Sequence, residues 1–306
     1  MTPTSRPVLM VTDIPAAHPR IPYFRRMAQA LDSATAPLPC RVDLDGVAYA
    51  GRKSLDAVGS GAVQMAWLNA SHLEALAPEL AALNLPFGLA DDALREPSRA
   101  STLVRLIDRH VRPAGVRALG LMRGADQLFV SPTRAIESPA DLRDQRVRVA
   151  GAGIYESILR AFDAVPVVMP IPQIPEAFTG LVGALDFVFT SPGGWQTQFG
   201  LDARHGTHVP GLMFINYVLL ANAVWVDSLD DTRRAALQDA ADHHVTWAWK
   251  AMEQDDAELL RAFAERGAVV HTVADTGEWR SRTESLRDAI KREHPQIVRA
   301  LQALDA

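Results

Sequence analysis

Short apolar runs alternate along the chain with segments in which apolar residues recur every three to four positions. The short runs predict β-strands, and the three-to-four spacing predicts amphipathic helices. In the first half of the chain, the pattern predicts strands at Val8–Thr12, Cys40–Asp45 and Val63–Leu68 and helices at Tyr23–Ser33, Lys53–Ser60 and Ser98–Val111. This alternation is typical of an α/β fold with a largely parallel sheet.

A second series of alternating elements follows and predicts a second lobe. Its elements are strands near Leu128–Ser131, Arg146–Ala150, Val167–Pro170 and Phe187–Thr190 and helices at Ser138–Leu142, Ile154–Phe162 and Ile174–Val182. After them, the run Val209–Ala221 predicts one long strand or a pair of strands.

The longest predicted element is a helix over Ser228–Arg266. Ser228 begins a Ser-Leu-Asp-Asp sequence that is typical of a helix N-cap, and Gly267 follows as a stop signal. Such a helix extends roughly 55 Å, more than the diameter of one small domain. We therefore predict two α/β lobes around a ligand cleft, with the helix spanning both. Residues 1–127 with about 210–250 form lobe I, and about 128–209 with 251–306 form lobe II.

The composition argues against several classes of partner. The 306 residues include 36 acidic and 31 basic side chains without a Lys/Arg block that would bind nucleic acid or an anionic membrane. No apolar run approaches the ~20 residues of a membrane-spanning helix. The first residues lack the basic and apolar regions of a signal peptide, which predicts either a cytosolic protein or one whose leader has been removed. The single cysteine, Cys40, excludes an internal disulfide.

The most informative segment for chemistry is Asp141–Glu156, which predicts a short helix, a turn, a strand and the start of another helix. Strand alternation places Val147 and Val149 on one face and Arg146 and Arg148 on the other. Arg148 lies near the carboxyl end of its strand, where open α/β sheets bind ligands, and a guanidinium matches both oxygens of a carboxylate. Arg148 is therefore a candidate ligand clamp, with an internal ion pair or a solvated arginine as the alternatives.

Signals for enzyme chemistry are weak. Gly151 and Gly153 follow a strand and precede a helix, as in a dinucleotide fingerprint, but Glu156 replaces the third glycine and would repel a pyrophosphate. Nucleophile-elbow, zinc-protease, phosphate-loop and Cys-x-x-Cys patterns are absent from the sequence. We expect no enzyme activity, no cofactor and no metal site. A nucleotide-using α/β enzyme is the alternative.

Several longer motifs occur in an order and spacing that resemble one protein family. The strongest is AIESPADLRDQRVRV at Ala135–Val149, which resembles that family's PIxSPxDLKGLKIRV. Weaker matches lie at Tyr49–Ala66, Leu83–Phe87, Val165–Pro170, Thr207–Pro210 and Asn222–Leu229. On these motifs, from about Ile21 to Glu265, the chain resembles the DctP-type solute-binding subunits of tripartite ATP-independent periplasmic (TRAP) transporters.

The resemblance implies a periplasmic-binding-protein-like fold and capture without chemistry. A small organic carboxylate would be bound in the periplasm, enclosed by closure of the lobes and passed to TRAP membrane permease subunits. Arg148 falls on the arginine that pairs with the ligand's carboxylate in that family. Strand-end position and family correspondence together predict that the other ligand-binding residues are Trp67, Asn69, Gln127, Phe189, Ser191, Trp195, Phe214 and Asn216. We expect a monomer that binds no nucleic acid and does not insert into a membrane; a ligand-sensing receptor with the same fold is the second alternative.

The chain departs from the family pattern at two positions. Ser191 stands where the family has a polar amide or acid that contacts the ligand, and Leu128 stands where some members have a second arginine for sugar acids. Phe187, Phe189 and Trp195 lie nearby in the sequence. These differences predict a ligand less polar than a sugar acid, such as an aromatic or branched-chain monocarboxylate or a 2-oxo acid.

Overall fold

The computed structural model describes residues 7–44, 52–88, 97–151, 153–169, 173–178, 185–199 and 203–305. The chain divides into two compact units. Unit 1 comprises Met1–Pro78, Ala93–Arg123 and Asn216–Ala251, and unit 2 comprises Glu79–Asp92, Gly124–Ile215 and Met252–Ala306. The segment Glu79–Asp92 thus belongs to unit 2, whereas the sequence placed it in lobe I.

Unit 1 contains a five-stranded sheet in the order β2-β1-β3-β10-β4. Its strands are β1 (Val8–Thr12), β2 (Cys40–Asp43), β3 (Met65–Asn69), β4 (Val116–Asp126) and β10 (Phe214–Asn222). Strand β1 pairs in parallel with β2 and β3, whereas β10 pairs antiparallel to β3. Every residue of β3 is buried, as expected for a central strand covered on both faces. The helices that follow these strands include α1 (Ile21–Asp32), α2 (Arg52–Gly59) and α4 (Pro97–Val111).

Unit 2 contains a six-stranded sheet in the order β11-β9-β5-β8-β6-β7. Its strands are β5 (Leu128–Ser131), β6 (Arg146–Val149), β7 (Val165–Val168), β8 (Phe187–Thr190), β9 (His205–His208) and β11 (Val269–Thr272). Strand β6 pairs in parallel with β7 and β8, and β5 pairs antiparallel to β8 and β9. Its helical elements include η4 (Pro139–Leu142), α5 (Ile154–Ala161), α6 (Ile174–Phe178), α7 (Pro192–Phe199), α10 (Gly277–Arg282), α11 (Glu284–Glu293) and α12 (Pro295–Asp305).

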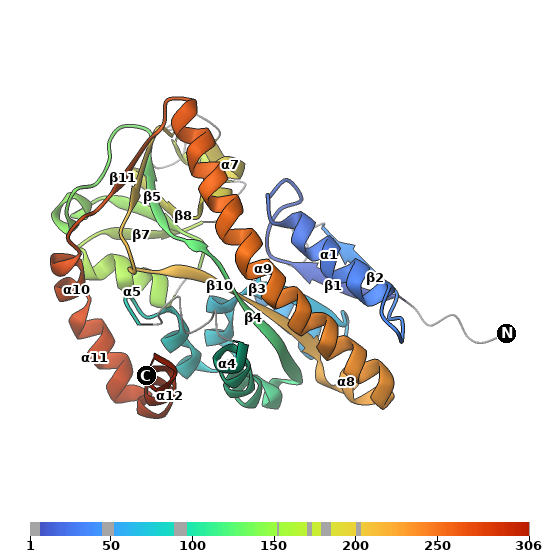
Figure 1. Ribbon diagram of the computed structural model, residues 1–306. Coiled ribbons are helices and arrows are strands. Elements are labelled where there is room, and N and C mark those ends of the chain that lie inside the picture. The colour runs from blue at the N-terminus through green and yellow to red at the C-terminus, as the bar shows by residue number, and fades with distance from the viewer. Residues whose placement is uncertain are drawn as a thin grey trace. The chain divides into compact units, whose positions relative to one another are not determined.

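The helix α9 (Asp231–Glu265) is an unbroken helix of 35 residues that begins in unit 1 and ends in unit 2 (Figure 1). The strands β4 and β10 also begin in one unit and end in the other. The predicted single helix over Ser228–Arg266 is in fact preceded by a separate short helix, α8 (Ala223–Ser228). Asp230, not Ser228, caps α9, because its carboxylate accepts a hydrogen bond from the Arg233 amide at 2.8 Å.

The remaining predicted elements agree with the structure to within a few residues, but the strands β9 and β11 and the helices α7, α10, α11 and α12 were not predicted. The strand β4 was not predicted either, and two 3-10 helices, η1 (Ala70–Ala75) and η2 (Pro78–Asn84), lie between β3 and α4. The run Val209–Ala221 becomes a strand only from Phe214 onward. The start of the motif at Tyr49 and the end of the predicted helix at Val182 lie outside the described residues. In the described part of the chain, no helix has both the length and the apolar character needed to cross a bilayer.

Candidate functional site

Polar groups from several strands lie at one end of the unit 2 sheet. The carboxyl ends of the parallel strands β6, β7 and β8 meet there. Because β5 runs antiparallel to β8, with Leu128 opposite Thr190, the residue before β5 reaches the same edge. Arg148, Ser191 and Gln127 therefore lie near the same end of three neighbouring strands. In open α/β sheets the carboxyl edge is where ligands bind.

Arg148 is a buried cation without a counter-charge among the described residues. Its side chain lies at the level of Val188 on β8 and Val167 on β7, and the residue is only 3% exposed. Its Nε donates a hydrogen bond to the carbonyl oxygen of Met169 at 2.9 Å. Burial lowers the pKa of Arg148 to about 10, with no acidic side chain contributing. A buried guanidinium without an acid favours binding of an external anion.

The turn after β6 leads into α5. Gly153 precedes the helix with φ of +74°, a conformation that favours glycine. Glu156 lies in the first turn of α5, where Arg160 donates to its carboxylate at 3.2 Å. This acid occupies the helix start that a pyrophosphate would need, in agreement with the sequence argument against a nucleotide.

Gln127 and Ser191 are polar groups of the same sheet edge. The Gln127 backbone donates to the carbonyl oxygen of Met213 at 3.1 Å, while its side-chain Nε2 is buried with no acceptor among the described residues. The Ser191 hydroxyl accepts a hydrogen bond from the Gly194 amide at 3.0 Å, which caps α7. Ser191 thus contributes to the start of a helix, and Gln127 retains donor capacity that the described residues do not use.

The predicted aromatic site residues of unit 2 are packed by protein. Phe189 stacks on Phe129 with ring centroids 4.7 Å apart, on the face of the sheet opposite to Arg148, since Arg148 pairs with Val188. Trp195 is fully buried, stacks on Phe263 at 4.5 Å and donates from Nε1 to the carbonyl oxygen of Ala203. Phe187, Phe214 and Phe162 are likewise buried, so these rings build the core of unit 2. The prediction of an apolar ligand rested partly on Phe187, Phe189 and Trp195, whose rings pack inside the protein, and partly on Leu128 and Ser191.

The other predicted site residues, Trp67, Asn69 and Asn216, belong to unit 1. Asn69 ends β3 and caps η1, since its side chain accepts a hydrogen bond from the Ser71 amide. Asn216 is buried one residue before Tyr217, which pairs with Asn69. Trp67 is buried against Phe24, with ring centroids 4.4 Å apart, and its Nε1 has no acceptor in the described part of the chain.

A polar pair in unit 1, Asp13 and His72, was not predicted from the sequence. Asp13 directly follows β1, and its Oδ2 accepts a hydrogen bond from the Asn69 amide at 3.1 Å. The same oxygen lies 3.0 Å from Nε2 of His72. Burial alone would lower the pKa of His72, but the hydrogen bond to Asp13 and the charges of Asp13 and Glu74 raise it overall. A lone acid directly after the first strand was the signal that could have identified this pair.

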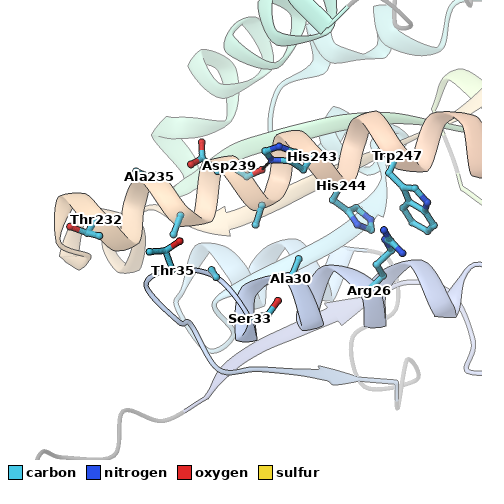
Figure 2. A pocket seen from close by; sticks show the side chains of 13 residues that line it. Arg26, Ala30, Ser33, Thr35, Thr232, Ala235, Asp239, His243, His244 and Trp247 are labelled. Carbon is cyan, nitrogen blue, oxygen red and sulfur yellow. Dashed lines mark hydrogen bonds between the residues drawn. The ribbon is translucent and has the colours of Figure 1, made fainter.

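A groove of about 470 Å³ lies in unit 1 between α1 and the first half of α9 (Figure 2). It exists because the facing positions are small, among them Ala30 and Ala235. Arg26 lies over the ring of Trp247 at 4.1 Å, and the buried His244 lies beside them. None of the predicted ligand-binding residues lines this groove.

The described residues contain no cluster of His, Cys, Asp or Glu that could hold a metal ion.

Comparison with known proteins identifies relatives of the chain. A family model described as DctP, bacterial extracellular solute-binding protein, family 7, matches residues 12–293. The chain is 21% identical over 259 residues to the 2,3-diketo-L-gulonate-binding periplasmic protein YiaO of Escherichia coli (strain K12), covering 82% of this chain and 76% of that protein.

Solved structures share the fold. DctP7, a Bordetella pertussis extracytoplasmic solute receptor binding pyroglutamic acid, matches with a TM-score of 0.87 and 18% identity, covering 98% of this chain and 99% of that one. The sugar acid binding protein DctPAm from Advenella mimigardefordensis strain DPN7T, in complex with galactonate, matches with a TM-score of 0.86 and 16% identity over 98% of each chain. The matches confirm the predicted two-lobed α/β fold and the resemblance drawn from the motifs.

Proposed function

Because the chain belongs to the DctP family of bacterial extracellular solute-binding proteins, we propose that it is a periplasmic receptor that captures a small organic carboxylate with Arg148. In this proposal it performs no chemistry and delivers the acid to the membrane permease subunits of a TRAP transporter. The family match argues against the nucleotide-using enzyme that the glycine turn suggested.

The observation that carries the proposal is the buried guanidinium of Arg148, which has no acidic partner among the described residues. A fully buried cation is costly in an apolar interior unless an anion offsets its lost hydration. The described residues offer it one carbonyl oxygen, that of Met169, and no acid. A ligand carboxylate can accept two parallel hydrogen bonds from the guanidinium fork, which a neutral ligand cannot match.

The names of the relatives support an acid as the ligand. One relative is named for 2,3-diketo-L-gulonate, and the two structures were solved with pyroglutamic acid and with galactonate. With the aromatic rings committed to the core, the proposal does not require an apolar ligand body. Gln127, whose side-chain nitrogen is buried without an acceptor among the described residues, is proposed as a second donor to the bound acid.

The test is a thermal-shift screen of the purified protein against small carboxylates, with nucleotides and neutral sugars as controls, because a ligand of the folded state raises the melting temperature. Acids should stabilise the wild-type protein and not Arg148→Met. Arg146→Met is the matched control, since Arg146 is exposed two residues away on the same strand. Stabilisation by nucleotides alone, or equal stabilisation of wild type and Arg148→Met by the same acids, would refute the proposal.

A further inference from the structure

The groove between α1 and α9 in unit 1 has the dimensions of a site for an elongated small molecule (Figure 2). Its volume of about 470 Å³ lies within the range of ligand pockets. It follows α9 from Thr232 to Trp247, which corresponds to roughly 22 Å along the helix axis. Small apolar side chains line much of this length, namely Ala30, Ala34, Ala235, Ala236 and Ala240.

The end of the groove at Trp247 holds a cation that no described acid neutralises. Arg26 is exposed, and its guanidinium lies 4.1 Å from the ring centroid of Trp247. No acidic side chain among the described residues forms an ion pair with Arg26. Asp239 also lines the groove, but its carboxylate points away from α1 in Figure 2. An anion is therefore the chemical complement of this end of the groove.

His244 adds a second polar group beside Arg26. The residue is 4% exposed, and its Nε2 is buried without a hydrogen-bond partner among the described residues. A buried polar atom without a partner is unfavourable and requires an explanation. Burial, with a smaller effect of Arg26, lowers the pKa of His244 to about 3, so the ring is neutral at pH 7 and carries one hydrogen that it can donate. In Figure 2 the side chains of Arg26 and His244 lie toward one another between the two helices.

We propose that this groove is a second binding site, for a linear carboxylate with an apolar chain. Arg26 turns from the Trp247 ring to bind the acid, the neutral ring of His244 donates to it, and the chain lies along the alanines. An aromatic acid fits less well, because the Trp247 ring is already packed against Arg26 and against Tyr23, whose ring centroid is 4.9 Å away. The lining residues all belong to unit 1, whereas Arg148 belongs to unit 2, so the two sites share no residue.

Two substitutions test the two halves of the proposed site. Arg26→Gln removes the charge that binds the acid, and Arg25→Gln is its control, because Arg25 is exposed next to it and does not line the groove. Ala235→Leu fills the space for the chain at an exposed helix position where leucine is well tolerated. Its control is Ala257→Leu, which makes the same change at an exposed position of α9 outside the groove.

The experiment measures, by calorimetry on the full chain, the affinity for decanoate below the concentration at which it forms micelles. Decanol, which has the chain without the acid, and acetate, which has the acid without the chain, should each bind roughly tenfold or more weakly than decanoate. Arg26→Gln and Ala235→Leu should each weaken decanoate binding roughly tenfold or more. The two control variants and Arg148→Met should bind decanoate as wild type does.

Three results would overturn the inference. The first is the absence of decanoate binding to wild type, and the second is equal affinity of wild type and Arg26→Gln for decanoate. The third is loss of decanoate binding in Arg148→Met with binding retained in Arg26→Gln and Ala235→Leu, because decanoate would then be a ligand of the Arg148 site. None of these results contradicts the proposed function, which fails on its own if no acid stabilises the wild-type protein through Arg148.

Discussion

Replacing Arg148 with methionine is expected to stabilise the unliganded protein and to weaken ligand binding. Methionine keeps an unbranched apolar stem and removes the charge. Burial lowers the pKa of Arg148 from its ordinary value to about 10, which corresponds to roughly 3 kcal/mol of unfavourable charge burial in the folded state. The variant also loses the hydrogen bond to Met169, worth about 1 kcal/mol. The expected net effect is an increase of about 2 kcal/mol in the free energy of unfolding.

The assay is urea unfolding followed by tryptophan fluorescence, with the melting temperature as a second measure. A gain of about 2 kcal/mol should raise the melting temperature by roughly 4 °C in a protein of this size. The pKa of Arg148 is lowered by folding, so below about pH 9 both the folded and the unfolded state carry the proton and the penalty is fully present. The difference in stability between wild type and Arg148→Met should therefore be constant from about pH 5 to pH 9. The affinity for an acid found in the screen should fall by about 2–4 kcal/mol.

Two outcomes would refute the reasoning. If Arg148→Met unfolds at a lower urea concentration than wild type, the guanidinium stabilises the unliganded fold. Its burial is then not a cost that a bound anion has to offset. If the variant binds the acid as tightly as wild type, the carboxylate is held elsewhere. Arg146→Met should leave both stability and affinity nearly unchanged, because Arg146 is exposed.

Two further predictions concern the core and pH. Trp195→Leu should lower the free energy of unfolding by about 3 kcal/mol, because it loses the stacking on Phe263 and the hydrogen bond to Ala203. The affinity for the acid, measured by calorimetry, should not change. Reduced affinity with unaltered stability would contradict this prediction. Burial, with a smaller effect of Arg26, lowers the pKa of His244 to about 3, so the unfolded state binds the proton first and wild-type stability falls as pH drops below about 6.5. His244→Phe should reduce that loss by about 1 kcal/mol per pH unit in urea titrations near pH 7 and pH 5; parallel curves would contradict it.

Most elements could be predicted where an apolar run is sharply bounded by polar residues, as at Val8–Thr12 and Phe187–Thr190. The strand β4 was missed because its sequence, VRALGLMRGAD, is rich in alanine, leucine, methionine and arginine, which favour helices. Its strand conformation comes from pairing inside the sheet, a non-local effect. The break before α9 was missed because Ser228 and Asp230 are both good N-caps, and the sequence does not decide between them.

The site was predictable in part. Alternation and strand-end position made Arg148 a candidate ligand clamp, with an internal ion pair or a solvated arginine as the alternatives, and the structure buries it near the carboxyl end of β6. Alternation could not show that Phe189 faces away from Arg148, because that depends on the pairing of Arg148 with Val188 between strands 40 residues apart in sequence. Asp13 had no local motif, since its importance depends on His72, which lies nearly sixty residues later.

The interleaving of the two units also determines the order in which they can be completed during synthesis. Unit 1 lacks a strand of its sheet until Asn222 has been made, and it lacks the first half of α9 until Ala251 has been made. Unit 2 is finished only with the last residues of the chain. Domains made of contiguous sequence fold one after another as they emerge, but here neither unit can fold while most of the chain is still unmade. Both units therefore reach their complete folds only after residue 251 has been made.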